Sequence, residues 1–170
     1  MKTVYRKGVA DYLNVGTTGE PKYVLMGVGF ESLDEEPGAK TETTCYIHES
    51  TSSSTITQYE TKFPYKSEVI ADEEAIMSLY KTGRDHEIGE AAEREYVRVD
   101  LYETTSSENT YKARKFRVCN EISSFTGEGG GKLKVEGTLN AVGDPIQGTF
   151  NVSTKTFAPA GAAAAASIRK

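Results

Sequence analysis

Hydrophobic and polar residues alternate with a period of two through most of the second half of the chain. In residues 96–102, valine and leucine side chains fall on one face, and Arg98 and Asp100 fall on the other. The same alternation recurs in three later segments, 115–122, 132–141 and 147–157. Alternation of this kind is typical of antiparallel strands that bury one face.

Turn-forming sequences separate these segments. Residues 104–110 are rich in Ser and Thr, residues 126–131 read TGEGGG, and residues 142–145 read VGDP. Glycine supplies the positive φ angles that such turns need, so we predict a four-strand meander with a tight turn at 142–145. In the first half, the pattern predicts strands at 10–15, 22–31 and 56–63.

One helix is predicted between the two halves. Asp72 is placed to cap its N-terminus, and Glu73 and Glu74 fall in its first turn, where the helix dipole favours negative charge. Apolar residues at 75, 76, 79 and 80 form one stripe, and Gly83 is a natural residue just past the C-terminus. A single short helix on a sandwich or barrel usually covers an edge or an open end.

Residues 33–57 read LDEEPGAKTETTCYIHESTSSSTIT and do not fit an ordinary compact domain. The only apolar cluster in this stretch is Cys45-Tyr46-Ile47. Structureless loops longer than about 12–15 residues are uncommon in compact domains, while Thr-rich sequence favours extended backbone. We therefore predict a polar β-arm that reaches off the domain body.

Composition supports one mainly β domain. The chain has 170 residues with 37% hydrophobic residues, which suits a thin, sheet-rich body with much polar surface. We expect residues 1–157 to form an antiparallel β-sandwich or half-barrel with one short α-helix and the long β-arm. Residues 158–170 are Ala-rich and are expected to be a flexible C-terminal tail.

Charge is unevenly distributed along the chain. The formal net charge is 20 − 25 = −5, residues 34–60 and 72–95 are each strongly acidic, and residues 111–118 (YKARKFRV) are basic. One interpretation is ordinary solvated charge; the other is that separate acidic and basic surfaces guide self-assembly. The overall acidity argues against tight DNA binding.

The sequence offers no convincing catalytic or metal-binding set. His48 and His86 are the only histidines, and the Cys45-x-x-His48 spacing lacks the remaining ligands of a zinc site. The glycines at 129–131 lack the lysine and the following helix of a phosphate loop. We expect no enzyme activity, no cofactor and no metal.

Targeting and redox signals are also weak. Cys45 and Cys119 could pair, but two thiols in a chain of this length are poor evidence for a disulfide. The N-terminus lacks the apolar segment of a signal peptide, and no apolar run approaches a membrane span. We expect a protein that is made in the cytoplasm and does not insert into membranes.

The order of these elements resembles that of phage tail tube proteins, especially the major tail protein of long noncontractile tails. A strand at 23–30 precedes the arm, a Thr-rich return at 54–59 runs into a strand ending at Phe63, and a helix follows from Asp72. The segment GTLNAVGDPIQGTFNVSTKTF (137–157) resembles the closing hairpin of that family. The similarity covers roughly residues 8–157, without the immunoglobulin-like domain that larger relatives append.

This resemblance implies a virion protein that forms hexameric rings, which stack into a tube for genome delivery. Its implied partners are other copies of itself, the tape measure protein in the lumen, and the tail tip and tail terminator proteins. DNA would pass through without specific binding, and assembly would take place in the host cytoplasm.

Three residue sets are candidates for roles in such a tube. The arm would bridge subunits through Asp34, Glu35, Glu36, Glu42, Tyr46 and Ile47. Its acids would lie on a basic patch of a neighbouring subunit, formed by Lys112, Arg114, Lys115 and Arg117. Candidates for the lumen are Arg98, Asp100, Lys132, Lys134 and Glu136.

Two alternatives stay open at this point. The tube of a contractile tail or of a secretion-type needle shares the expected fold. A ligand- or carbohydrate-binding β-sandwich, such as a virion decoration module, would need an exposed aromatic platform; the chain has ten Tyr but no Trp.

Overall fold

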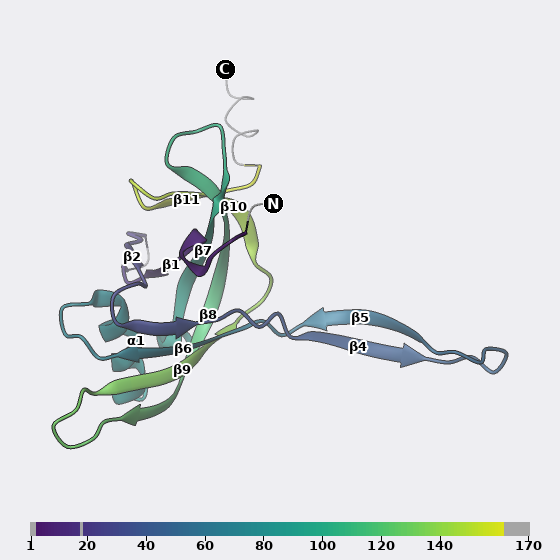
Figure 1. The fold of residues 1–170 in the computed structure, drawn as a ribbon, viewed down its shortest axis with the longest axis horizontal. Helices are drawn as coiled ribbons and strands as arrows, with labels where there is room; N and C mark the ends of the chain where they lie inside the picture. Colours follow the sequence, from purple (N-terminus) through teal and green to yellow (C-terminus); the bar gives the residue numbers. More distant parts are fainter. Residues whose placement is uncertain (1–2, 18, 162–170) are drawn as a thin grey trace.

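The computed structural model describes residues 3–17 and 19–161 as a curved antiparallel sheet with one α-helix and one long hairpin (Figure 1). The main sheet has the strand order β2-β1-β7-β8-β9-β6-β3, with β10 and β11 added beside β8. This architecture confirms the predicted mainly β, half-barrel fold. The element bounds are η1 (Arg6–Gly8), β1 (Val9–Asn14), β2 (Tyr23–Leu25), β3 (Phe30–Leu33), β4 (Ala39–Thr44), β5 (Ser53–Tyr59), β6 (Lys62–Glu68), α1 (Glu74–Arg84), η2 (Gly89–Ala92), β7 (Glu93–Thr104), β8 (Thr110–Thr126), β9 (Lys134–Ala141), β10 (Ile146–Asn151) and β11 (Thr156–Pro159).

Strand β8 is the longest element, and it pairs along both edges. One edge pairs with β7, and the other pairs first with β10 and then with β9. Ala141 of β9 lies opposite Val118, and Ile146 of β10 lies opposite Lys115. Strands β9 and β10 therefore run in the same direction along one edge of β8, as two parts of one interrupted strand.

This arrangement corrects the predicted tight turn at 142–145 and the predicted closing hairpin around it. The chain bulges there through Gly143, whose φ is +77°, and then continues along β8. The reversal comes instead at residues 152–155, before β11, where Lys155 adopts a φ of +53°. A Gly-Asp-Pro sequence suits a bulge as well as a turn, so sequence could not decide between them.

The same reversal divides the predicted strand 147–157 into β10 and β11, and two further predicted strands are each divided in the structure. The segment 22–31 becomes β2 and β3, because the chain turns between them at Gly29, which has a φ of +83°. A Cβ on Gly29 would lie 2.7 Å from Ile76 Cδ1, so the backbone here packs directly on α1. The segment 56–63 divides into β5 and β6 at residues 60–61, which mark the base of the arm.

The sheet buries side chains on both of its faces. Phe63, Tyr96 and Phe116 form one aromatic cluster, with ring centroids 4.7–6.1 Å apart. Val97 and Val99 pack on the opposite face with Phe150 and others. The predicted shared face of the two valines is confirmed. On the other face of β7, which the alternation marks as polar, Tyr96 and Arg98 are buried as well.

Helix α1 covers one end of the first cluster, and both of its ends differ from prediction. The helix begins at Glu74 with Glu73 as its N-cap and no capping side chain, because a turn at Ile70–Glu73 delays its start. The prediction that Asp72 caps the helix is therefore wrong. Gly83 lies inside the helix, where a Cβ would meet Ile122 Cγ1 at 2.6 Å. Glycine here permits close packing on β8.

Gly137 of β9 gives a test of this packing. A Cβ at this buried position would lie 2.6 Å from the backbone oxygen of Glu121 and 2.7 Å from the Tyr65 hydroxyl. We predict that Gly137→Ala lowers the free energy of unfolding by about 1–3 kcal/mol, because the sheet backbone must move. Urea denaturation measures this change. Gly127→Ala is the matched control, since its Cβ would have no contact closer than 3.4 Å; equal losses in both variants would contradict the packing argument.

Candidate functional site

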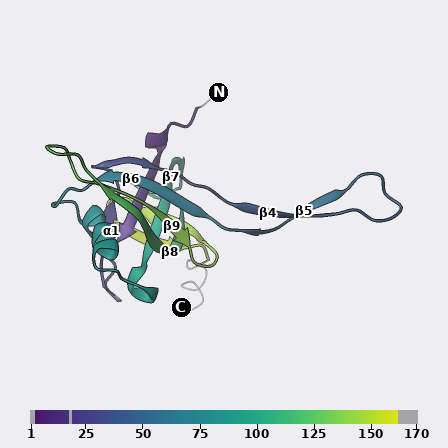
Figure 2. The same ribbon diagram turned by 90° about the horizontal axis from the view of Figure 1, so that it is seen from below.

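The arm is a β-hairpin that stands away from the body. Within the described residues, strands β4 and β5 pair only with each other, and each of their residues is exposed. Two perpendicular views show the hairpin leaving the body on the side away from α1 (Figures 1 and 2). The predicted polar β-arm is confirmed as part of the fold. Its paired portion covers residues 39–59 rather than 33–57.

The two faces of the arm differ in chemistry. Ile56 pairs with Thr41, and Tyr59 pairs with Ala39, so these side chains share one face. The opposite face carries charged and polar residues, including Lys40, Glu42, Thr44, Ser53 and Gln58. Ile56 and Tyr59 are both more than half exposed in the single chain.

The tip of the arm presents further apolar surface. Tyr46 is 60% exposed and stacks beside His48 with ring centroids 6.1 Å apart. Ile47 is fully exposed. Burying an isoleucine side chain is worth about 1.5–3 kcal/mol, and the single chain leaves this side chain in water.

The root of the arm continues the backbone pairing of β3 and β6. The Asp34 N–H donates to Pro64 O at 3.0 Å, and Glu36 and Lys62 exchange two bonds of 2.8 and 2.9 Å. Beyond Pro37, Gly38 has a φ of +64°, and a Cβ there would lie 2.3 Å from Glu60 O. This bend separates the arm from the main sheet.

A row of charged side chains crosses the sheet beneath this root. Asp11 of β1 lies opposite Arg98 of β7, which in turn lies opposite Arg114 of β8. The Glu35 carboxylate accepts hydrogen bonds from both terminal nitrogens of Arg114, at 2.5 and 2.9 Å. The same carboxylate lies 3.3 Å from Arg98 Nε.

The inner end of this row is fully buried. Asp11 Oδ1 accepts a hydrogen bond from the Tyr96 hydroxyl and lies 3.6 Å from Arg98 Nη1. Arg6 adds a hydrogen bond of 2.5 Å to Asp11 Oδ2 and one of 3.0 Å to the Leu33 carbonyl. The N-terminal segment, the arm root and three strands therefore meet at one cluster.

The protonation states follow from this geometry. Burial raises the pKa of the Tyr96 hydroxyl well above its ordinary value, and the charge of Asp11 adds to this effect, so Tyr96 remains a donor. Burial also raises the pKa of the Glu35 carboxyl, but the hydrogen bond and charge of Arg114 and the charge of Arg98 outweigh it. The net result is a lowered pKa for Glu35.

The predicted arm-to-patch pairing between subunits stays a prediction, but the same residues already have partners within one chain. Glu35 and Arg114 do pair, but within one chain. The other members of the basic patch also pair within the chain, Lys112 with Glu103, Lys115 with Glu95 and Arg117 with Glu93. Among the remaining predicted arm residues, Asp34 and Glu36 lie in the root and Glu42 lies on the polar face of β4.

The candidate lumen residues occupy two different environments. The Arg98 side chain is only 9% exposed and held by Asp11 and Glu35, so it does not line an open channel. Lys132, Lys134 and Glu136 lie near the β9–β6–β3 edge, where they pair with Glu68, Glu31 and Lys66. Their placement toward a lumen, like that of Asp100, stays a prediction.

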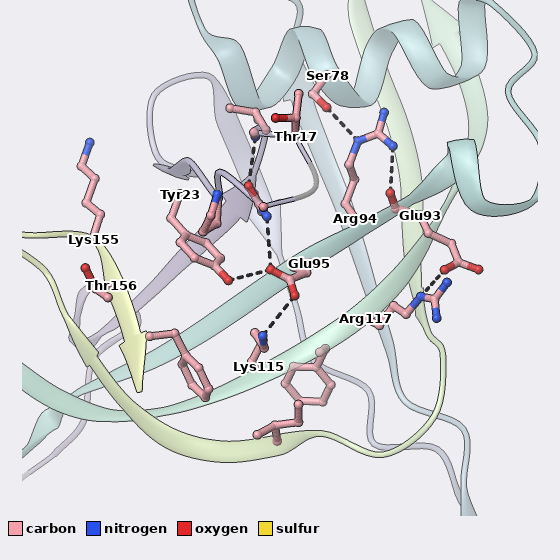
Figure 3. A pocket seen from close by; sticks show the side chains of 18 of the residues that line it. Thr17, Tyr23, Ser78, Glu93, Arg94, Glu95, Lys115, Arg117, Lys155 and Thr156 are labelled. Carbon is pink, nitrogen blue, oxygen red and sulfur yellow. Dashed lines mark hydrogen bonds and ion pairs between the residues drawn. The ribbon is translucent and has the colours of Figure 1, made fainter. Parts of the chain in front are cut away.

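A polar groove of about 1160 Å³ opens between α1, the β1–β2 connection and the β10–β11 hairpin (Figure 3). Its central carboxylate, Glu95, accepts hydrogen bonds from the Tyr23 hydroxyl at 2.8 Å, Lys115 at 3.0 Å and Asn14 at 3.1 Å. Arg94 nearby donates to Ser78 at 3.1 Å. Since these charged groups already bind one another, the groove resembles a fixed polar surface more than a reaction centre.

Within residues 3–17 and 19–161, no group of three or more His, Cys, Asp or Glu side chains is arranged to hold a metal ion. His48 lies near Glu49 at the arm tip, and His86 follows α1 with a φ of +52°. Cys45 and Cys119 are free thiols. In the same part of the chain, no helix is long and apolar enough to cross a membrane.

Together these features define a half-barrel with a free-standing β-hairpin arm. Several solved structures are similar to this chain in fold. The SPP1 tail tube matches with a TM-score of 0.66 and 8% identity over 85% of this chain and 78% of that one. The tail of an empty GTA particle, solved with C6 symmetry, matches with a TM-score of 0.56 and 11% identity over 85% and 98%.

A third match is the sixfold-symmetrised baseplate of the anti-feeding prophage, with a TM-score of 0.50 and 10% identity over 89% of this chain and 99% of that chain. No family model and no curated protein sequence matches the chain. The chain therefore has the tail tube fold, a likeness carried by shape and not by sequence.

Sequence reasoning missed the inner part of the charged cluster. Asp11 stands among apolar residues in a predicted strand, and Tyr96 begins another. A carboxylate inside an apolar strand is a sign of a buried charge that needs a partner. That sign identifies Asp11 as unusual, but the partners follow only from strand register.

The lowered pKa of Glu35 predicts a pH-dependent contribution to stability. A depressed carboxyl pKa stabilises the fold above the ordinary value of about 4.3, and the effect is lost as pH falls through the native pKa. We predict that Glu35→Gln lowers the free energy of unfolding by about 2 kcal/mol at neutral pH, with a smaller difference in acid. Urea titrations from about pH 7 to about pH 3 test this.

The exposed pair Glu103–Lys112 on β7 and β8 provides the control. Glu103→Gln is expected to change stability by less than about 1 kcal/mol throughout. If the difference between wild type and Glu35→Gln does not vary with pH, the ionised carboxylate contributes nothing to stability.

Proposed function

We propose that this protein is the structural subunit of a phage-type tail tube, whose copies associate through the arm and the open edges of the sheet. The observation that carries the proposal is an exposed hairpin arm on a body with the tail tube fold. A two-stranded hairpin alone in water is marginally stable at best. Contact with a neighbouring subunit would give the arm the third strand or the packing surface that its own body does not supply.

The sheet edges support the same role. In the described part of the chain, β3 pairs only with β6, and β11 pairs only with β10. Unpaired edges template pairing with other strands, and a heterologous contact that closes around a ring while remaining open along its axis builds a tube. Neighbouring subunits would thereby join their sheets into one β-lined channel.

The finer parts of the proposal are a hexameric ring, a noncontractile tail and passage of the genome through the lumen. The sixfold symmetry of two of the matched assemblies supports the hexamer. We propose a tape measure protein in the lumen, tip and terminator proteins at the ends, assembly in the host cytoplasm, and a lumen face that includes Asp100, Lys132, Lys134 and Glu136. The Ala-rich tail falls mostly on residues 162–170, outside the described residues.

The alternative within this class is the tube of a contractile tail or secretion-type needle. A sheath gene beside this one would favour that alternative. Negative-stain electron microscopy of the concentrated purified protein tests the class itself, and we expect rings or tubes. A strictly monomeric protein at high concentration, also in the presence of tail partners, would count against the proposal.

Removing the arm should separate folding from assembly. We predict that replacing residues 40–58 with an Asn-Gly turn, which joins the paired Ala39 and Tyr59, leaves the thermal transition of the body within a few degrees. Assembly should be abolished, because the bridging hairpin is gone. Circular dichroism and light scattering measure the two properties, and normal tubes from this variant would contradict the role of the arm.

The arm tip allows a finer test. Because Ile47 is fully exposed, we predict that Ile47→Ser changes the free energy of unfolding by less than about 0.5 kcal/mol. The concentration required for assembly should rise roughly tenfold, since apolar contact with a neighbour is lost. Sedimentation across a concentration series measures this. Ser52→Ala, a small change in the same exposed loop, should leave assembly as in wild type.

A further inference from the structure

We propose that Glu35 is a latch that fixes the direction of the arm relative to the body. It does so by placing one carboxylate between Arg98 and Arg114, two arginines that would otherwise repel each other. The direction of the arm is a property of the single chain. Only the consequence for assembly rests on the proposed function.

The two arginines need this carboxylate. They lie directly opposite each other on β7 and β8, and like charges in that position destabilise a sheet. The Arg98 side chain is 9% exposed and that of Arg114 is 28% exposed, so water screens them poorly. Among the described residues, Asp11 is the other acid near Arg98, at 3.6 Å. Glu35 is the carboxylate that contacts both arginines.

Glu35 lies in the short connection between the body and the arm, so its ion pairs hold that connection against the body. Glu35 lies two residues after β3 ends and four before β4 begins. Its neighbours Asp34 and Glu36 use their backbone to pair with β6 on one side of the root. In the described root, residues 34–38, the Glu35 side chain makes the ion pairs to β7 and β8.

Two attachments in different directions fix an orientation that one alone does not. With the ladder to β6 alone, the root is itself an edge strand that is held on one side, and it can pivot about that ladder. The bidentate geometry of Glu35 on Arg114 adds a second, directional attachment. Arg6, which donates to the carbonyl of Leu33 next to the root, supports the same side of the cluster.

The native thiol at the arm tip provides a probe. Cys45 is exposed and Cys119 is partly buried, so a fluorophore on Cys45 in a Cys119→Ser background reports the motion of the arm. Time-resolved anisotropy is measured on the full-length monomer at concentrations below assembly. We expect Glu35→Gln to increase the amplitude of the fast depolarisation clearly over wild type, while circular dichroism shows a folded body.

Hydrogen exchange gives an independent measurement at the root. In Glu35→Gln we expect the amide protons of Asp34, Glu36 and Lys62 to exchange roughly tenfold faster or more, while the amides of β8 change much less. Arg114→Lys, which keeps the charge but loses the bidentate geometry, should act in the same direction. It also serves as the test variant if Glu35→Gln does not fold.

The matched control is Glu103→Gln, which removes an exposed ion pair from the same two strands without contact to the arm root. It should leave both anisotropy and exchange at the root unchanged. If Glu35→Gln and Arg114→Lys fold and keep wild-type anisotropy and exchange, the backbone ladder alone orients the arm and the latch is overturned. The same holds if Glu103→Gln mobilises the arm equally.

An assembly assay tests the role of Glu35 and the proposed function separately. If wild type forms tubes, the latch variants should require a higher protein concentration to do so, because a mobile arm must be ordered on contact. If wild type forms no tubes, the proposed function fails, while the anisotropy and exchange results still decide whether Glu35 orients the arm.

Discussion

The body depends on the pairing of β8 with three other strands along its two edges. This 17-residue strand pairs with β7 on one side and with β9 and β10 in succession on the other. Its alternate side chains also connect the main parts of the molecule. Arg114 binds the arm root, Phe116 and Val118 enter the core, and Asn120 accepts from Tyr65 and donates to Leu79 of α1. A shift of register in β8 would therefore displace the arm root and the helix together.

Unlike the body, the arm has no hydrophobic core, because every residue of β4 and β5 is exposed. Its strands extend past Gly38, away from the body (Figure 2). Their register keeps Ile56 and Tyr59 on one exposed face. The cross-strand contacts, such as Thr43 with Ser54 at 3.0 Å, are polar and individually weak. The arm is therefore specified by local pairing and not by burial, which leaves its apolar groups free for another surface.

Local pattern was sufficient to predict the main elements of the fold. Period-two alternation identified the strands around Val97, Phe116 and Leu139, and composition identified the arm. It was not sufficient where tertiary contacts decide the outcome. The sequence at 142–145 permits a turn or a bulge, and only pairing with β8 makes it a bulge. Gly83 is a residue type common just past a helix end, but it lies inside α1, where the nearby Ile122 leaves no room for a larger side chain.

The candidate site shows the same limit more sharply. Of the predicted pairing between arm acids and the basic segment, the structure contains Glu35 with Arg114, within one chain. Pairing between subunits stays a prediction, because a list of charges does not tell whether partners lie in one chain or in two. The register of β1, β7 and β8 aligns Asp11, Arg98 and Arg114, and the path of the chain after β3 brings Glu35 to them.

Apolar residues at these positions could give comparable or greater stability, because desolvation offsets much of the attraction in a buried ion pair. Apolar contacts, however, tolerate sliding, whereas a carboxylate held by two guanidinium nitrogens has one favourable orientation. The hairpin has no core that constrains it. A directional contact at its root therefore fixes its orientation, which additional apolar burial would not do.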